Sequence, residues 1–119
     1  MIYSKKKVKE RKPIGWLSGE IKTPPFSSGA RVEAGYLLCR LQNGDLLPLP
    51  HSRPMPGVGS HCHELRVKDA HAEWRIIYRV DSDVILVVAV FEKKTRETPQ
   101  HIMDVCRYRL RQYDEIAGG

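Results

Sequence analysis

The chain has 119 residues, 41% of them hydrophobic and 29% charged, a composition that suits one compact domain and excludes a disordered or collagen-like chain. Its net charge of +6 favours an anionic partner, which would be nucleic acid first, an acidic protein second and a membrane surface third. The alternative is that the charge serves only to keep the domain soluble. The longest nearly unbroken apolar stretch, residues 84–91, is far shorter than the roughly 20 residues of a membrane-spanning helix, and the basic first residues lack the apolar segment of a secretory signal. We therefore expect a cytoplasmic protein without a membrane span.

The first third of the chain predicts a basic tail, a short strand and a helix. Residues 1–12 are rich in Lys and have little to bury, which is typical of a solvated, flexible tail before a single domain at residues 13–117. Residues 14–21 form a short apolar segment that is closed by two prolines, as in an edge or first strand. From residue 28 the apolar period is near 3.6, which predicts an amphipathic helix ending at Asn43-Gly44. The expected buried stripe of this helix is Ala30, Ala34, Leu37, Leu38 and Leu41.

The middle of the chain predicts a stiff loop followed by three strands. Residues 45–60 hold four prolines and two glycines, too many for a helix or an interior strand. Three strand-like runs follow, at residues 62–67, 73–80 and 84–91, and short turns join them into an antiparallel meander. The third run is apolar on both faces, as expected of a central strand that is covered on each side.

A second helix is expected at the end of the chain. Thr98-Pro99 is a typical helix start, with an N-cap hydroxyl followed by a proline at the first helical position. The expected buried face of this helix is Ile102, Val105, Cys106, Leu110 and Tyr113. The elements together predict an α+β fold in which a small, mostly antiparallel four-stranded sheet packs against helices.

The cysteines and histidines offer little for a metal or redox site. Three cysteines, far apart and without a C-x-x-C pair, favour reduced and buried thiols. His61 and His63 have no third ligand nearby, so neither a metal nor a cofactor is expected. His63 falls on the apolar face of its strand and is expected to be a hydrogen-bonded core residue. His61, at the mouth of the loop, is a candidate general acid or base.

Cationic side chains gather on one face of the predicted sheet. Alternation along the first two runs, with a five-residue turn between them, places Arg66 opposite Arg75 and puts Glu64 and Arg79 on the same face. One carboxylate cannot balance three guanidinium groups, and opposed arginines repel. Further cations follow the third run: Lys93, Lys94 and Arg96. The pattern favours an electropositive groove, with a solvated face of ion pairs to neighbouring glutamates as the alternative.

Seven short motifs lie along the chain in a distinctive order. They are HELR at 63–66, WRIIY at 74–78, FEKKT at 91–95 and the Thr98-Pro99 helix start, preceded by LQNG at 41–44, LPLP at 47–50 and SRPM at 52–55. In order and spacing these motifs resemble the RelE/ParE toxin superfamily, and most of all its HigB-like, phage-related branch, over residues 13–116. The resemblance implies a RelE-like fold and the toxin half of a type II toxin-antitoxin pair. The implied partner is a small helix-turn-helix antitoxin whose acidic segment covers the cationic face.

The resemblance also implies an activity. Many members bind the ribosomal A site and cut mRNA there without a metal, whereas ParE-type members act on DNA gyrase. The positions that surround the scissile phosphate would be Cys62, Glu64, Arg75 and Lys93, with Cys62 and Glu64 where RelE itself has lysines. The expected function is a ribosome-dependent endoribonuclease with the ribosome and mRNA as partners. A same-fold inhibitor of gyrase or another target, and a non-catalytic RNA-binding module, are the alternatives.

Metal-free RNA cleavage assigns a role to each candidate residue. The substrate's 2′-hydroxyl is the nucleophile, so the protein needs a base, an acid and cations for the phosphorane. Glu64 is the expected base, with His61 as its substitute, and Arg75 and Lys93 would stabilise the phosphorane. The acid would be Lys94 or His101. The cations expected to hold neighbouring phosphates are Arg53, Arg66, Arg79, Lys94 and Arg96.

Overall fold

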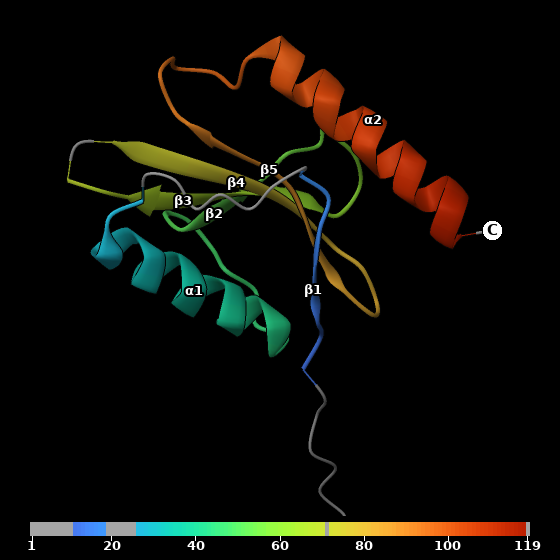
Figure 1. The fold of residues 1–119 in the computed structure, drawn as a ribbon, viewed down its shortest axis with the longest axis horizontal. Helices are drawn as coiled ribbons and strands as arrows, with labels where there is room; N and C mark the ends of the chain where they lie inside the picture. Colours follow the sequence, from blue (N-terminus) through green and yellow to red (C-terminus); the bar gives the residue numbers. More distant parts are fainter. Residues whose placement is uncertain (1–10, 19–25, 71, 119) are drawn as a thin grey trace, which may run out of the picture.

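The computed structural model describes residues 11–18, 26–70 and 72–118, and in them a β-sheet lies between two helices (Figure 1). Within this part of the chain no helix is long and apolar enough to cross a membrane. Most of the expected tail, residues 1–10, lies outside the described residues. The elements in chain order are β1 (Ile14–Trp16), α1 (Ser28–Gln42), β2 (Ser52–Pro54), β3 (Cys62–Lys68), β4 (Glu73–Val80), β5 (Ile85–Glu92) and α2 (Gln100–Ala117).

The sheet of the described residues has five strands, in the order β1-β5-β4-β3-β2. Strands β2 to β5 pair antiparallel, whereas β1 pairs parallel with β5. The expected four-stranded, mostly antiparallel sheet is therefore corrected to a five-stranded mixed sheet, while the α+β class holds. The missed strand is β2, inside the proline-rich loop, which pairs with residues 63–65 of β3. Because β2 is an edge strand, it tolerates Pro54, which has no N–H to donate.

Strand β5 confirms the expectation of a strand that is covered on both faces. It lies between β1 and β4, and its first five residues, 85–89, are buried. Ile85 and Val87 belong to the apolar cluster on the α1 side, and Leu86 and Val88 to the cluster on the α2 side. The two helices therefore share one sheet as their common core.

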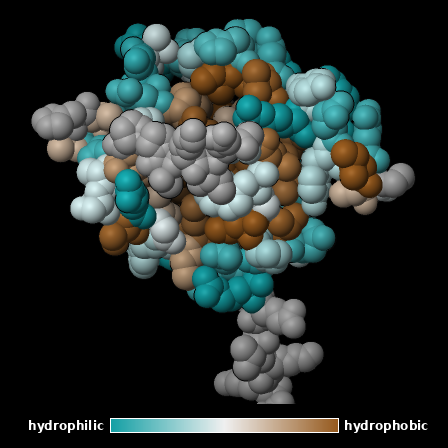
Figure 2. Space-filling model, viewed as in Figure 1, coloured by the Kyte–Doolittle hydropathy of each residue, from teal (hydrophilic) through white to brown (hydrophobic). Residues whose placement is uncertain are grey.

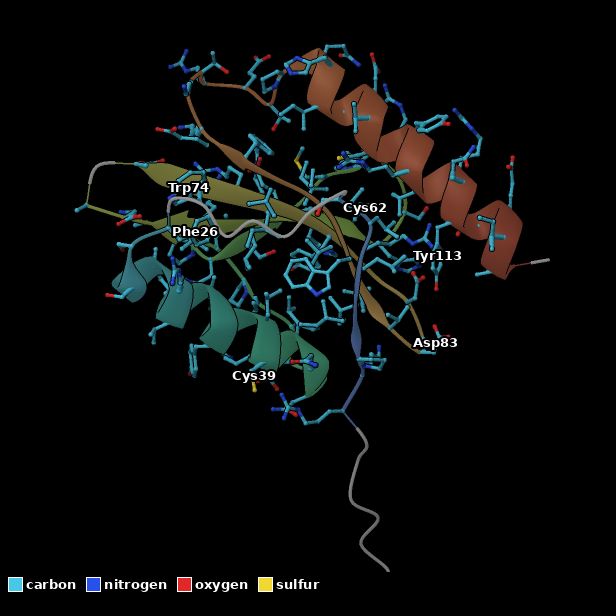
Figure 3. All side chains as sticks on the ribbon, in the orientation of Figure 1. Phe26, Cys39, Cys62, Trp74, Asp83 and Tyr113 are labelled. Atoms are coloured by element: carbon cyan, nitrogen blue, oxygen red, sulfur yellow. The ribbon has the colours of Figure 1, made fainter. Side chains whose placement is uncertain are left out.

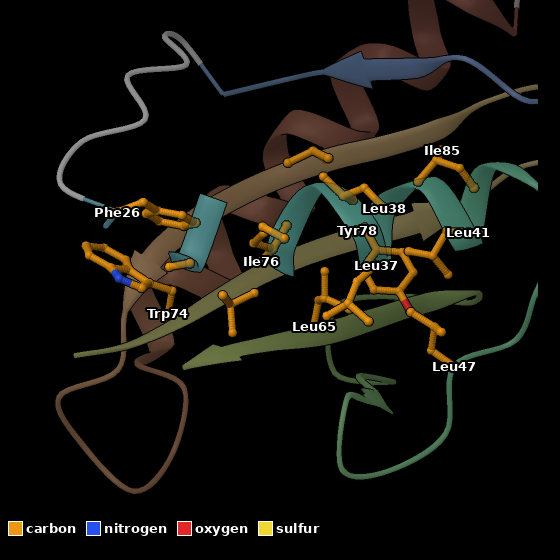
Figure 4. Packing of buried hydrophobic residues seen from close by; sticks show 14 residues of the cluster. Phe26, Leu37, Leu38, Leu41, Leu47, Leu65, Trp74, Ile76, Tyr78 and Ile85 are labelled. Atoms are coloured by element: carbon orange, nitrogen blue, oxygen red, sulfur yellow. The ribbon is translucent and has the colours of Figure 1, made fainter. Parts of the chain in front are cut away.

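Helix α1 has the predicted apolar stripe. Ser27 caps its first turn by accepting a hydrogen bond from the backbone N of Ala30 at 3.1 Å. Gly44, just past its end, has a φ of 93°, in the left-handed region that favours glycine. All five predicted stripe residues are buried and pack on the sheet residues labelled in Figure 4. Burial of each large apolar side chain contributes about 1.5–3 kcal/mol, so this stripe anchors α1 to the sheet.

Helix α2 lies on the opposite face and differs from its prediction at its buried face and at its start. Of the five residues expected to be buried, Cys106 and Leu110 are buried and Ile102 and Tyr113 are partly buried. Val105 is 39% exposed because one residue turns an α-helix by about 100°. Thr98 does not cap the helix. The N-cap residue is Pro99, which makes no side-chain cap hydrogen bond. Figure 2 shows hydrophilic residues along the outward side of α2.

Candidate anion-binding site

A hollow of about 120 Å³ lies at one end of the sheet, beside the start of α2. Its walls come from β2, β3, β4, the end of β5 and the loop of residues 93–99 that leads into α2. Two glutamates, Glu64 and Glu97, line it. Six cationic side chains line it as well: Arg53, Arg66, Arg75, Lys93, Lys94 and Arg96. We call this feature the cationic hollow.

The strand register brings the core of the cationic hollow together as the sequence predicts. In β3 and β4, Arg66 is paired with Arg75 and Lys68 with Glu73. Side chains alternate across a strand, so Glu64 and Arg66 point to the same face, which is the α2 side. Helix α2 packs through Cys106 and Leu110 on residues nearer the other end of these strands, such as Ile77. The end of the sheet that carries Arg66 and Arg75 therefore lies against the 93–99 loop and not against α2.

Glu64 is the hub of the cationic hollow. Its side chain is only 3% exposed, and Oε1 accepts a hydrogen bond from Nε of Arg53 at 3.2 Å. Oε2 accepts one from the hydroxyl of Thr98 at 3.0 Å, and Nε of Arg75 lies 3.5 Å from Oε1. This carboxylate therefore links β2, β3, β4 and the 93–99 loop. Its oxygens are already engaged by three donors.

Arg75 is largely engaged by the protein itself. Its side chain is 7% exposed, and Nη2 donates to Oε1 of Glu73 at 3.2 Å. Nη1 donates to the backbone oxygen of Trp74 at 3.3 Å. Together with Glu64, these contacts match the ion-paired alternative, as does the pair of Arg53 with Glu64 and, at 4.0 Å, the pairs of Lys93 with Glu73 and Lys94 with Glu92. The contacts of Arg75 hold its guanidinium in the wall of the hollow, between two carboxylates that it shares with Arg53 and Lys93.

Arg66 has the opposite character. Its Nε is buried, and within the described residues it has no hydrogen-bond partner. The Arg66 guanidinium stands across the strand pair from Arg75, an arrangement that costs stability unless an anion offsets the repulsion. Arg66 therefore differs from Arg53 and Arg75 in that no carboxylate of the described residues is paired with it.

The loop after β5 adds exposed charges at the rim. Nζ of Lys93 lies 4.0 Å from Oε1 of Glu73 with 37% of the side chain exposed, and Nζ of Lys94 lies 4.0 Å from Oε1 of Glu92 with 76% exposed. Pairs this long and this exposed contribute little to stability, so both ammonium groups are open to a ligand. Thr95 donates its hydroxyl to the backbone oxygen of Glu97 at 2.6 Å, which tightens the loop between these cations and α2.

Arg79 is not part of the cationic hollow, and its expected place beside Glu64, Arg66 and Arg75 is wrong. Arg79 lies on β4 like Arg75, but it is four positions further along, and four positions along a strand cover about 13 Å. Its Nε donates to Asp81 at 2.7 Å and its Nη2 to Asp114 of α2 at 2.7 Å. These hydrogen bonds, to Asp114 first and Asp81 second, raise the pKa of Arg79. We call this group the Arg79 clamp.

The candidate histidines are also outside the hollow. His61 has a left-handed φ of 62° and lines a separate open groove of about 850 Å³ beside the Arg79 clamp. His63 stacks on Tyr78 with ring centroids 5.4 Å apart, but its Nδ1 is buried without a hydrogen-bond partner among the described residues, which corrects the expected bond. His101 is exposed in the first turn of α2 and does not line the hollow. In the described ranges, no group of three or more His, Cys, Asp or Glu side chains could hold a metal ion.

Sequence reasoning did not assign five residues that line the hollow to the site: Phe91, Thr95, Glu97, Thr98 and Pro99. Thr98 and Glu97 matter most for its charge and hydrogen bonds. Thr98 was assigned to the helix cap, so its bond to Glu64 had no separate signal in the sequence. Glu97, an exposed second carboxylate at the rim, sits in a charged run where nothing marks it out. Both reach the hollow because the 93–99 loop folds back over β3, a path that no local pattern encodes.

The structure is that of an α+β protein with a hollow lined mainly by cationic side chains at one end of its sheet. The family model described as Phage derived protein Gp49-like (DUF891) matches residues 25–111, and the chain belongs to this family, which is RelE-like and toxin-related in general. No curated protein matches the chain. The matched residues include all those that line the cationic hollow.

Proposed function

We propose that this protein is the toxin of a type II toxin-antitoxin system, of the HigB-like branch, and cleaves mRNA on the ribosome in the cytoplasm without a metal. Membership in a toxin-related, phage-derived family supports the class of protein. The cationic hollow supports a polyanion as its target. Its cognate antitoxin would be a small helix-turn-helix protein with an acidic segment, because such a segment complements the excess of cations around the hollow.

The size of the hollow favours the RNA backbone as the bound group. Its volume of about 120 Å³ is well below the roughly 300–1,000 Å³ of ordinary small-molecule pockets. A phosphoryl group fits such a space, whereas a whole nucleotide does not. Arg66 and Lys93 would hold the scissile phosphate above Arg75, and Arg53, Lys94 and Arg96 the neighbouring phosphates. Contacts of this kind position the strand and leave the choice of bases to other surfaces.

The proposed reaction is a transfer of the phosphoryl group within the RNA. The 2′-oxygen forms a bond to phosphorus while the bond from phosphorus to the 5′-oxygen breaks, which leaves a 2′,3′-cyclic phosphate and a 5′-hydroxyl. The base takes the 2′-proton, and the acid gives one to the departing 5′-oxygen. Glu64 is the proposed base and Lys94 the acid. Arg53, with 41% of its side chain exposed, would have to move to an RNA phosphate to release Oε1 of Glu64 for this role.

The observation that carries the proposal is the buried Nε of Arg66, which has no hydrogen-bond partner among the described residues, on a side chain that stands opposite Arg75. The test is primer extension on mRNA in a translating extract, with wild type, Arg66→Ala and Arg31→Ala. Arg31, exposed on α1, is the matched control for the loss of one cation. We expect cleavage inside codons for wild type and Arg31→Ala and its loss for Arg66→Ala. Intact mRNA with wild-type protein would reject the proposed cleavage.

A second candidate is a toxin of the same fold that inhibits DNA gyrase or another target by binding alone. The enclosure of Glu64 by Arg53, Arg75 and Thr98 favours it, because a base needs a free oxygen lone pair. A supercoiling assay run beside primer extension separates the two candidates. Inhibited supercoiling with uncut mRNA would support the binding toxin.

A further inference from the structure

In the described part of the chain, a side-chain hydrogen bond ties the 93–99 loop to the middle of the sheet. The hydroxyl of Thr98 donates to Oε2 of Glu64 at 3.0 Å, across 34 residues of sequence. The loop that it holds carries Lys93, Lys94 and Arg96, half of the cations that line the hollow. Thr98 and Glu64 are therefore the contact through which β3 sets the position of the loop.

This bond comes at the expense of the helix that follows. A threonine before a helical proline ordinarily caps the first turn with its hydroxyl, which stabilises a helix. Here the N-cap residue is Pro99, no side chain caps the turn, and no acidic residue lies in it to offset the helix dipole. Local rules of this kind are broken mainly where a site requires it.

The other contacts of Glu64 explain what the Thr98 bond adds. Arg53 and Arg75 both lie at Oε1, so Thr98 is the partner of Oε2 among the hydrogen bonds of the described residues. Without the hydroxyl, Oε2 would be a buried oxygen lacking a donor, and the carboxylate would be free to turn toward Arg53 or Arg66. The loop would then be held to the sheet at Lys93, whose backbone N donates to the backbone oxygen of Glu73 at 2.7 Å, but no longer at its Thr98 end.

We propose that Thr98 is a positioning residue, whose hydroxyl acts through Glu64 to hold the 93–99 loop so that its cations and Arg66 face successive phosphates. The proposal rests on the proposed function for its ligand, since the phosphates are those of an RNA backbone. Thr98 itself contacts Glu64 and takes no part in bond making.

The test compares three variants of the full chain: Thr98→Val, Thr98→Ser and Ser27→Ala. Valine has nearly the shape of threonine without the hydroxyl, and serine keeps the hydroxyl. Ser27→Ala is the matched control, because it also removes a hydroxyl with one side-chain hydrogen bond, but at the start of α1 and outside the hollow. Two readouts are measured for each: amide hydrogen exchange of residues 93–97, and affinity for a single-stranded RNA oligonucleotide over a range of salt concentrations.

We expect Thr98→Val to speed exchange in residues 93–97 about tenfold and to weaken RNA binding about tenfold. The slope of log affinity against log salt should fall by roughly 0.7 for each RNA phosphate that the variant no longer neutralises. Thr98→Ser should restore both readouts to wild-type values, and Ser27→Ala should leave both unchanged.

Two results would overturn the proposal. One is wild-type exchange in Thr98→Val, which would mean that the bond does not hold the loop. The other is fast exchange with an unchanged affinity and salt slope, which would make the bond purely structural. If wild-type protein binds no RNA, the proposed function fails, while the exchange comparison still decides whether Thr98 holds the loop.

Discussion

Two arginines on the same strand and the same face of the sheet have opposite surroundings. Arg79 donates to Asp81 with Nε and Nη2, at 2.7 and 3.0 Å, and to Asp114 with Nη1 and Nη2, at 3.0 and 2.7 Å. Bidentate pairs of this length are among the stronger hydrogen bonds in proteins. Arg75, four positions earlier, has longer contacts of 3.2–3.5 Å and lies beside Arg66.

The difference lies in what the neighbouring elements supply. At the Arg79 clamp, the β4–β5 turn and α2 bring two carboxylates to one guanidinium, and the ring of Tyr113 lies 5.9 Å from it (Figure 3). At the cationic hollow, the 93–99 loop brings mainly cations. At the Arg79 end of this face, the charged groups are paired with one another and hold α2 to the sheet. At the Arg75 end, cations outnumber carboxylates. Strand position alone does not distinguish a structural arginine from a binding one.

The largest expected effect is on RNA binding, and it comes from a substitution in the cationic hollow. Arg66→Glu places a negative charge opposite Arg75, which the protein then neutralises internally, so we expect RNA affinity to fall about 100-fold, or about 2.8 kcal/mol. The unfolding free energy should stay equal or rise, because the repulsion between the two arginines disappears. Fluorescence anisotropy with labelled RNA and urea unfolding measure the two quantities. Unchanged affinity would remove Arg66 from the site.

The reverse pattern is expected at the Arg79 clamp. Arg79→Ala leaves Asp81 and Asp114 without their partner and unfastens the end of α2, so the unfolding free energy should fall by about 1–3 kcal/mol. RNA affinity at 25 °C should change less than about threefold, since the clamp is outside the hollow. A large loss of affinity in folded Arg79→Ala would show that the two ends act as one surface.

The sequence predicted those parts of this comparison that depend on a regular period. The strand alternation gave the pairing of Arg66 with Arg75, and the helical period gave all five buried residues of α1, because each pattern is enforced by burial on one face. The sequence also placed Arg79 on the correct face. These inferences need no knowledge of how separate elements meet.

What the sequence could not provide is the meeting of elements distant along the chain. Asp114 reaches Arg79 from 35 residues away, and Thr98 reaches Glu64 from 34 residues away. Both contacts depend on the angle and height at which α2 lies over the sheet. Strand β2 was missed for a related reason, since its pairing with β3 is set by tertiary contacts that override a proline-rich composition.

A pH titration sharpens the comparison with a smaller effect. Hydrogen bonds from Arg79 lower the pKa of Asp114 from its usual 3.8. A carboxyl with a lowered folded-state pKa contributes stability that is present above pH 3.8 and is lost as the pH falls through the folded value. Wild type should therefore unfold at higher urea than Asp114→Asn at pH 6, and the difference should shrink below pH 3.8. A difference that is constant with pH would mean that the clamp does not depend on the charge of Asp114.

The smallest expected effect uses a thiol as a reporter of the clamp. Burial raises the pKa of Cys62 and Cys106 to about 11, so at pH 8 both are almost fully protonated and poor nucleophiles. Cys62 lies between the sheet and α2 (Figure 3), along the groove that Arg79 also lines. In native protein, iodoacetamide should therefore label the half-buried Cys39 first.

Removal of the Arg79 clamp should change this order of reactivity, whereas a lower positive charge in the cationic hollow should not. Arg79→Ala is expected to speed the labelling of Cys62 a few-fold, because the end of α2 that covers it opens more often. Arg66→Glu should leave the rate at the wild-type value, since that residue does not hold α2. Peptide mass spectrometry after timed labelling gives the rate at each cysteine. Equal rates in all three proteins would mean that the apolar contacts of Cys106 and Leu110 fasten α2 without the clamp, and Arg79 would then be an arginine whose charge is merely neutralised.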